Sequence, residues 1–172
     1  MTPMIVPAQG PATGLSTRIA RPELTLGDTL TVTASPGAVS FTLVPGGIAT
    51  GSSSVTVTTN WTGISLLSSV RLYGSFSSAT TALSGGTPVS YIPSSAVLGK
   101  VATGTPTTYT PFTQTNPLGG AGASLLLFSQ TSILSLSGNR SDNLDLEINL
   151  TSLPQLPAAT YTGVLTLQAQ AL

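Results

Sequence analysis

The chain has 172 residues, of which only 6% are charged, with 5 basic and 5 acidic side chains. An ordinary globular chain carries about 25% charged residues, and this chain also lacks histidine and cysteine. The usual general base, the thiolate nucleophile and every disulfide are therefore excluded. We expect a protein that is not an enzyme and needs no cofactor. A nucleic-acid partner is also not expected, because it would require clustered basic residues.

Hydrophobic residues make up 40% of the chain. That fraction is enough for a buried core, because disorder requires low hydrophobicity together with high charge. Serine and threonine together account for roughly 30% of the residues, well above ordinary usage, so hydroxyl groups replace charges on the surface. No apolar run approaches the ~20 residues of a membrane span. We expect one domain and no membrane insertion.

Residues 1–22 are predicted to form an extended N-terminal arm, because prolines at positions 3, 7, 11 and 22 break any regular strand. The arm nevertheless carries apolar side chains that a solvated tail does not need. These are Met4, Ile5, Val6, Leu15 and Ile19. We therefore expect another surface to cover the arm, and we expect residues 23–172 to form the folded domain.

Short strands with turn residues between them follow the arm. Apolar residues alternate mainly with hydroxyl residues over 24–34, 39–43 and 53–61, and with Arg71, Tyr73 and Ser75 over 70–76. A period of two predicts that each strand buries one face and exposes the other. No window shows a helical stripe, and 18 Gly and 13 Pro punctuate the chain. The class is predicted to be all-β.

The segment from 84 to 122 is less regular and rich in Gly, Pro and Thr. Within it, we interpret 91–93 and 96–98 as edge strands or loop anchors. Strong strand patterns return over 124–130, 133–137, 143–150 and 160–172. Strands of this number and length predict a single immunoglobulin-like or jelly-roll β-sandwich.

One short segment holds the only acidic cluster, which consists of Asp142, Asp145 and Glu147. Carboxylate oxygens are calcium ligands, although this spacing does not match an EF-hand loop. Asp145 and Glu147 share a strand face, as a pair of glycosidase carboxylates might, but neighbouring same-face side chains are the default on a solvated strand. The sequence therefore predicts no metal site and no catalytic site, and the three acids are retained only as weak calcium candidates.

Three sequons begin at Asn60, Asn139 and Asn149. They are candidate glycosylation sites if the chain is exported by a cell that modifies asparagine.

The run Leu156-Pro157-Ala158-Ala159-Thr160-Tyr161, followed by an alternating strand to Leu172, resembles the end of secreted bacterial pilin-like and spore-coat-U-like sandwich domains. Those families often close with a Leu-Pro-Ala-Gly-Thr-Tyr turn and a final alternating strand. Ala159 stands where they have glycine, and the early cysteine pair of many pilins is absent. The resemblance implies a structural subunit of a surface fibre, in which an extended segment of one subunit completes the sandwich of the next.

Together these features predict a cell-surface or extracellular subunit that polymerises with copies of itself by β-strand donation, with an assembly chaperone or secretion machinery as further partners. The N-terminal arm is the candidate donor, and the C-terminal strand with Leu165 and Leu167 is the alternative donor. The other hypothesis is a monomeric secreted adhesion or carbohydrate-binding sandwich that uses surface aromatic residues.

Overall fold

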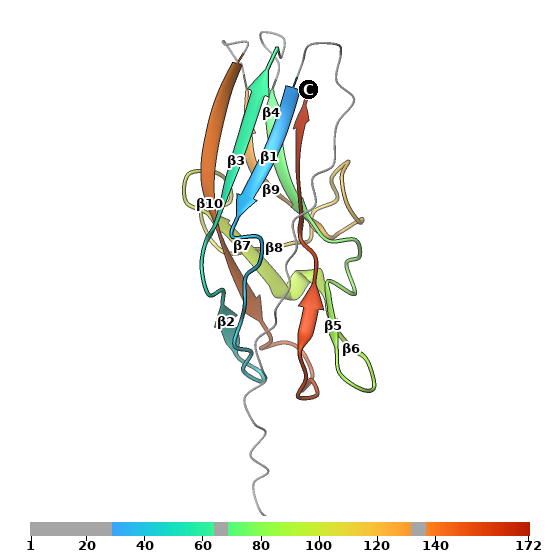
Figure 1. Ribbon diagram of the computed structural model, residues 1–172. Coiled ribbons are helices and arrows are strands. Elements are labelled where there is room, and N and C mark those ends of the chain that lie inside the picture. The colour runs from blue at the N-terminus through green and yellow to red at the C-terminus, as the bar shows by residue number, and fades with distance from the viewer. Residues whose placement is uncertain (1–28, 64–68, 132–136) are drawn as a thin grey trace, which may run out of the picture.

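The computed structural model describes residues 29–63, 69–131 and 137–172. These residues form strands β1 to β12 and one 3-10 turn, η1, at Ser94–Ala96. The strands pack as an all-β sandwich, which confirms the predicted fold class (Figure 1). The predicted arm at 1–22, with its apolar residues Met4, Ile5, Val6, Leu15 and Ile19, lies outside the described residues. Most of the predicted strand at 133–137 does so as well.

The larger sheet is antiparallel and runs in the order β1-β3-β10-β7-β8, with β2 paired to the lower part of β10. β10 is its longest strand, because it continues the predicted alternation at 143–150 backwards to residue 137. Its upper half pairs with β3 and its lower half with β7. The strand bounds are β1 Thr29–Ser35, β2 Ile48–Thr50, β3 Val55–Thr62, β7 Val97–Val101, β8 Thr110–Pro111 and β10 Ser137–Asn149.

Two three-stranded sheets complete the fold, in the orders β12-β4-β9 and β11-β5-β6. The strand bounds are β4 Val70–Ser75, β5 Leu83–Gly85, β6 Ser90–Ile92, β9 Ser124–Gln130, β11 Tyr161–Gly163 and β12 Thr166–Ala171. Apolar side chains from all three sheets form one continuous core.

Phe112 is a fully buried member of this core, although it comes from the segment with the weakest strand pattern. Its side chain is fully buried and meets the ring of Phe76 edge to face, with ring centroids 5.3 Å apart. Two buried glycines make room for it. A Cβ added at Gly74 would lie 2.9 Å from the Phe112 ring, and one at Gly99 would lie 3.2 Å from it. Phe112 therefore occupies a space left by glycines on β4 and β7.

Three strand predictions need correction. Residues 39–43 bury alternate side chains as expected but form no strand. This segment accepts one backbone hydrogen bond, from Ser52 N–H to Ser40 O. The predicted strand at 160–172 divides into β11 and β12, which belong to different sheets. β7 is not an edge strand, because it lies between β10 and β8.

The turn at 156–161 is stabilised by Tyr161, whose hydroxyl donates a hydrogen bond to Pro157 O at 3.0 Å. The ring is fully buried. Burial raises the pKa of the Tyr161 phenol above its ordinary value, and a hydrogen bond with Ser90 opposes this shift.

The outer face of β1, β3 and the upper half of β10 carries only hydroxyl and amide side chains. The register aligns them in rows across the three strands. The rows are Thr29, Thr62 and Ser137; Thr31, Asn60 and Asn139; Thr33, Thr58 and Ser141; and Ser35, Thr56 and Asn143. Some neighbours form hydrogen bonds with each other, and the Thr58 and Ser141 hydroxyl oxygens, for example, lie 2.8 Å apart. This neutral face, which we call the hydroxyl face, is the exposed counterpart of the alternating patterns in the sequence.

Candidate functional site

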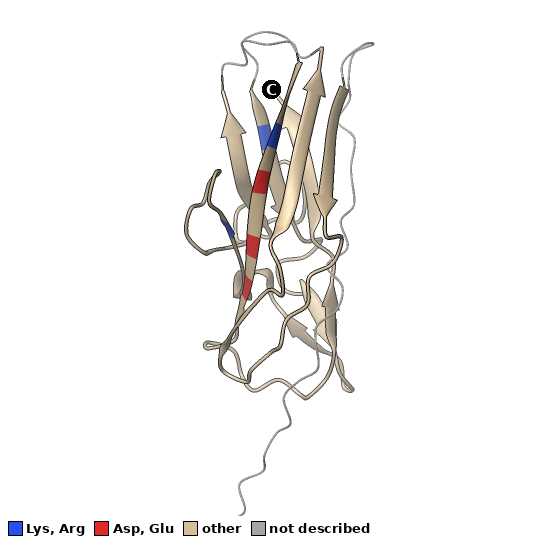
Figure 2. Ribbon diagram, turned by 60° about the vertical axis from the view of Figure 1, so that its left-hand side comes forward, with Lys and Arg blue, Asp and Glu red and all other residues tan. Residues whose placement is uncertain are grey.

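The charged residues gather on one strand. All the acidic side chains of the described residues lie on β10, as does Arg140 (Figure 2). The remaining described cations are Arg71 on β4 and Lys100 on β7. Because the chain has so few charged residues, this strand is the main candidate for a functional site.

The pleat of β10 separates the three calcium candidates. Asp142 points inward and is buried, whereas Asp145 and Glu147 have the opposite parity and lie on the outer face. The three carboxylates therefore do not converge on one point. Among the residues that the structure describes, no group of three or more acidic side chains could hold a metal ion.

Asp145 belongs instead to a surface ion pair. Lys100 Nζ lies 3.3 Å from Asp145 Oδ2, and about a third of each side chain is exposed. The Lys100 ammonium also lies 4.7 Å from the centre of the Tyr109 ring, and Ser54 donates a hydrogen bond to Asp145. Because water screens such a pair, it contributes little to stability.

The second ion pair consists of a buried carboxylate and a partly exposed guanidinium. Asp142 accepts hydrogen bonds from Arg140 Nε at 2.7 Å, Arg140 Nη2 at 2.9 Å and Thr103 Oγ1 at 2.5 Å. Arg140 Nη2 also donates to Thr103 O. The Asp142 side chain is 2% exposed and that of Arg140 is 26% exposed. This cluster joins β10 to the loop after β7 and is the most polar part of the described interior.

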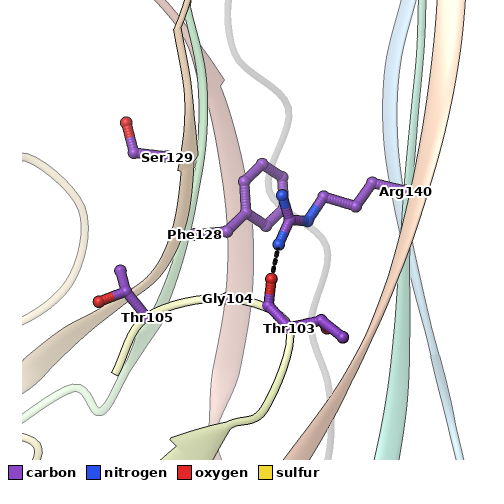
Figure 3. Close-up of a pocket in the computed structure, with 6 residues that line it drawn as sticks. All are labelled: Thr103, Gly104, Thr105, Phe128, Ser129 and Arg140. Carbon is purple, nitrogen blue, oxygen red and sulfur yellow. Dashed lines mark hydrogen bonds between the residues drawn. The ribbon is translucent and has the colours of Figure 1, made fainter. Parts of the chain in front are cut away.

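A small pocket opens beside this cluster. The Arg140 guanidinium lies 4.7 Å from the centre of the Phe128 ring, which supports it from β9. The pocket has a volume of about 200 Å³ and is lined by Thr103, Gly104, Thr105, Phe128, Ser129 and Arg140 (Figure 3). We call it the Arg140 pocket. The sequence did not predict this pocket, because the strand was expected to begin only at residue 143. The sequence did contain one indication that Arg140 and Asp142 point inward. Both lie an even number of residues before the inward-facing Leu144 on the same strand.

Next to Arg140 on the inner face of β3 lies an unpaired hydroxyl. Thr59 is the cross-strand partner of Arg140 and is fully buried, yet its Oγ1 has no hydrogen-bond partner. A buried polar group without a partner carries an uncompensated desolvation cost.

We therefore expect Thr59→Val to stabilise the protein by about 1 kcal/mol, because valine keeps the shape and removes the unpaired hydroxyl. Urea unfolding would measure the change. Thr58→Val is the matched control, since its hydroxyl bonds Ser141 on the exposed face, and it should not stabilise. Equal stabilisation by both variants, or a loss in Thr59→Val, would contradict the role given to the unpaired hydroxyl.

Leu165 and Leu167, predicted at a subunit interface, are 3% and 1% exposed in the core of their own chain. Both lie inside the sandwich that β12 completes, and their role as contact residues stays a prediction. The C-terminal strand is consequently a poor candidate donor.

The sequons occupy two different settings. Asn60 and Asn139 are exposed cross-strand partners on the hydroxyl face. Asn149 is partly buried, and its Oδ1 accepts hydrogen bonds from Thr151 N at 3.0 Å and from Thr151 Oγ1 at 2.6 Å. Glycosylation of these asparagines stays a prediction.

Most aromatic side chains lie in the core. Buried rings in the described part of the chain are those of Phe41, Trp61, Tyr73, Phe76, Phe112, Phe128 and Tyr161. Tyr91 is half exposed. The seven buried rings are therefore not available to a carbohydrate-binding platform, and among the described aromatic residues only Tyr91 and the partly buried Tyr109 reach the surface.

Two sheet edges meet on one side of the sandwich. β1 ends the larger sheet and β12 ends the opposing one, and the two strands lie side by side without sharing a ladder (Figure 1). Among the described residues, neither strand has a ladder partner on its outer edge. Such edges present unpaired peptide groups to an incoming strand.

No helix in the described parts of the chain is long and apolar enough to cross a membrane. Comparisons of the chain with protein-family models, with curated proteins and with solved structures found no match.

Proposed function

We propose that the chain is a structural subunit of an extracellular filament, in which one copy donates an extended strand to the sandwich of the next. The observation that carries this proposal is the meeting of the β1 and β12 edges, each of which lacks an outer ladder partner among the described residues. A donated strand there would gain backbone hydrogen bonds and bury alternate side chains.

The arm at 1–22 supplies the donor in this proposal. It is rich in apolar side chains, and the alternation of a strand would place Met4 and Val6 toward the acceptor. The alternative donor, β12, is already part of its own sandwich. Head-to-tail donation produces a filament when the rotation between neighbouring subunits does not close into a ring.

The composition is consistent with this use. Subunits that remain packed together need little electrostatic repulsion, and this chain has a formal net charge of 0. Export to the cell surface, with an assembly chaperone or secretion machinery, is part of the same proposal.

Deleting residues 1–22 is expected to abolish filaments and leave a folded monomer or a short-lived aggregate, because the donor is lost while the described core is kept. Negative-stain microscopy and gel filtration would report the assembly state. Circular dichroism and cooperative urea unfolding would report the fold.

Val6→Asp is a sharper variant, because a charge on the inserted side of the arm cannot be buried without a large cost. Thr2→Asp, at the end of the arm, is the matched control and should still polymerise. Filaments that persist without residues 1–22 would rule out the arm as donor. A full-length chain that stays monomeric at high concentration would refute self-assembly itself.

A further inference from the structure

We propose that, of the three sequons, the one at Asn149 accepts an N-linked glycan on the folded chain, and that Glu147 presents this sequon to the modifying enzyme. The site is the segment Glu147-Ile148-Asn149-Leu150-Thr151. It forms the end of β10 and the start of the following turn, beside β2 at the lower end of the sandwich (Figure 1). The inference rests on the export that is part of the proposed function, because asparagine glycosylation modifies exported chains.

The hydroxyl group of this sequon contacts its asparagine. A sequon needs a serine or threonine two residues after the asparagine. β10 ends at Asn149 and the chain turns, so that Thr151 N and Thr151 Oγ1 both donate hydrogen bonds to Asn149 Oδ1, at 3.0 and 2.6 Å. Because a backbone N–H can only donate, the acceptor is the amide oxygen. The nitrogen Nδ2, which receives the glycan, has no hydrogen-bond partner among the described residues and is not buried.

The other two sequons are held inside the sheet. Residues two apart on a strand lie about 6.6–6.8 Å apart along it, so the hydroxyl stands a full pleat away from the asparagine. The hydroxyl of the Asn139 sequon, that of Ser141, instead lies 2.8 Å from the Thr58 hydroxyl on β3. Asn60 lies between β1 and β10, and Asn139 is its cross-strand partner. An enzyme that takes up either asparagine has to break long ladders of the larger sheet.

The end of β10 is held less firmly. β2 pairs with it through three residues only, and the ladder with β7 stops at Ile148. Asn149 therefore has a ladder partner on one side, Ile48, whose side chain is 52% exposed. Short ladders near the surface open locally at a lower free energy than central strands do. Opening here releases β2 and the buried Leu150, whereas opening at Asn60 breaks two central ladders.

Glu147 supplies a charge next to this sequon. It stands two residues before Asn149 and therefore on the same face of β10. Its carboxylate has no ion pair or hydrogen bond among the described residues, whereas Asp142 and Asp145 are each in an ion pair. A free carboxylate can form a charge-assisted hydrogen bond with a basic group of an enzyme. The other two sequons have no charge at the corresponding position.

The reaction joins Asn149 Nδ2 to the anomeric carbon of a sugar carried on a lipid pyrophosphate. The bond between that carbon and the phosphate oxygen breaks, and the lipid pyrophosphate leaves with the electron pair. The amide nitrogen gives up one proton to a base of the enzyme, and nothing is oxidised or reduced. A glycan beside β2 leaves the β1 and β12 edges in the upper part of the sandwich free (Figure 1).

Glycosylation of the purified, folded full-length chain in vitro tests the inference without export or assembly. The enzyme is a bacterial oligosaccharyltransferase of the class that selects an acidic residue two positions before the asparagine, supplied with a lipid pyrophosphate-linked glycan. Mass spectrometry of the glycopeptides locates the product. We expect modification at Asn149 and at neither of the other sequons. Glu147→Gln should slow the reaction by about tenfold or more, the loss that follows removal of one charge-assisted contact.

Asp145→Asn is the matched control, because it removes a neighbouring carboxylate from the same face of β10, and it should react as the unaltered chain does. Thr58→Glu places an acid two residues before Asn60, which should stay unmodified because its strand remains in the sheet. Circular dichroism checks that each variant is folded. The inference is overturned if Asn149 is not modified while an acceptor peptide is, if Glu147→Gln reacts as fast as Asp145→Asn, or if Asn60 in Thr58→Glu reacts as readily as Asn149.

The outcomes separate this inference from the proposed function. A chain that forms filaments and is not modified contradicts the glycosylation site alone. A chain that is modified at Asn149 and never assembles supports the site and contradicts the filament.

Discussion

Replacing Asp142 by alanine is expected to lower the free energy of unfolding by about 3 kcal/mol. Removal of one partner from a buried ion pair costs about 3–5 kcal/mol, because the other charge is left without compensation. The lower end of this range applies, since Arg140 is 26% exposed and can gain some hydration. Thr103 would lose the acceptor of its hydroxyl as well. Urea unfolding at neutral pH would measure the difference.

Asp145→Ala provides the comparison within the same strand. Asp145 pairs with Lys100 in a setting where 32% and 30% of the two side chains are exposed, so its loss should cost less than about 1 kcal/mol. The double variant Arg140→Met with Asp142→Leu should recover most of the stability, because apolar residues can replace a buried pair. Equal losses at Asp142 and Asp145, or a double variant no more stable than Asp142→Ala, would contradict this account.

Phe112→Ala should lower the free energy of unfolding by about 3–5 kcal/mol, the range for removing a buried aromatic ring. The ring lies between Gly74 and Gly99 and against Phe76. Small residues on two sides leave few side chains that could move into the vacated space, so a cavity should remain. Thermal or urea unfolding would measure the loss.

Tyr91→Ala is the control for Phe112, because Tyr91 is 50% exposed and its truncation should cost less than about 1 kcal/mol. A small effect at Phe112 would mean that the segment around it is not part of the cooperative core.

The sequence predicts a strand best where the residues that bury their side chains in a regular pattern are also the residues that pair in a sheet. β3, β4 and β9 lie close to their expected ranges. β3 alternates between buried and more exposed side chains along its length and pairs with β10. β4 and β9 bury most of their side chains, and their ladder shifts register between Leu72 and Tyr73. The hydroxyl face follows from the same alternation.

Alternation reports which side chains are buried, and it does not report hydrogen bonding. Residues 39–43 bury every second side chain without joining a ladder. The same limit explains the C-terminal error. The inward parity continues from Tyr161 through Leu165 to Leu167 while the chain passes from one sheet to another. The alternation of buried and exposed side chains does not show where the chain passes from one sheet to another.

The Arg140 pocket was not predictable in the same way. Its parts come from β10, β9 and the loop after β7, segments brought together only by the packing of the two sheets. Residue types alone indicated an exposed acidic cluster. Asp142 proved to face inward, where Thr103 and Arg140 satisfy its oxygens.

The hydroxyl face has a consequence for the conditions in which its contacts can persist. Screening by salt acts on interactions between charges, with a Debye length of about 10 Å at 0.1 M, and the rows across β1, β3 and the upper half of β10 carry no outward charge. They also contain no group that titrates between mildly acid and mildly alkaline pH. A contact made through this face should therefore keep its strength from dilute buffer to brine, and across the pH range of most natural waters.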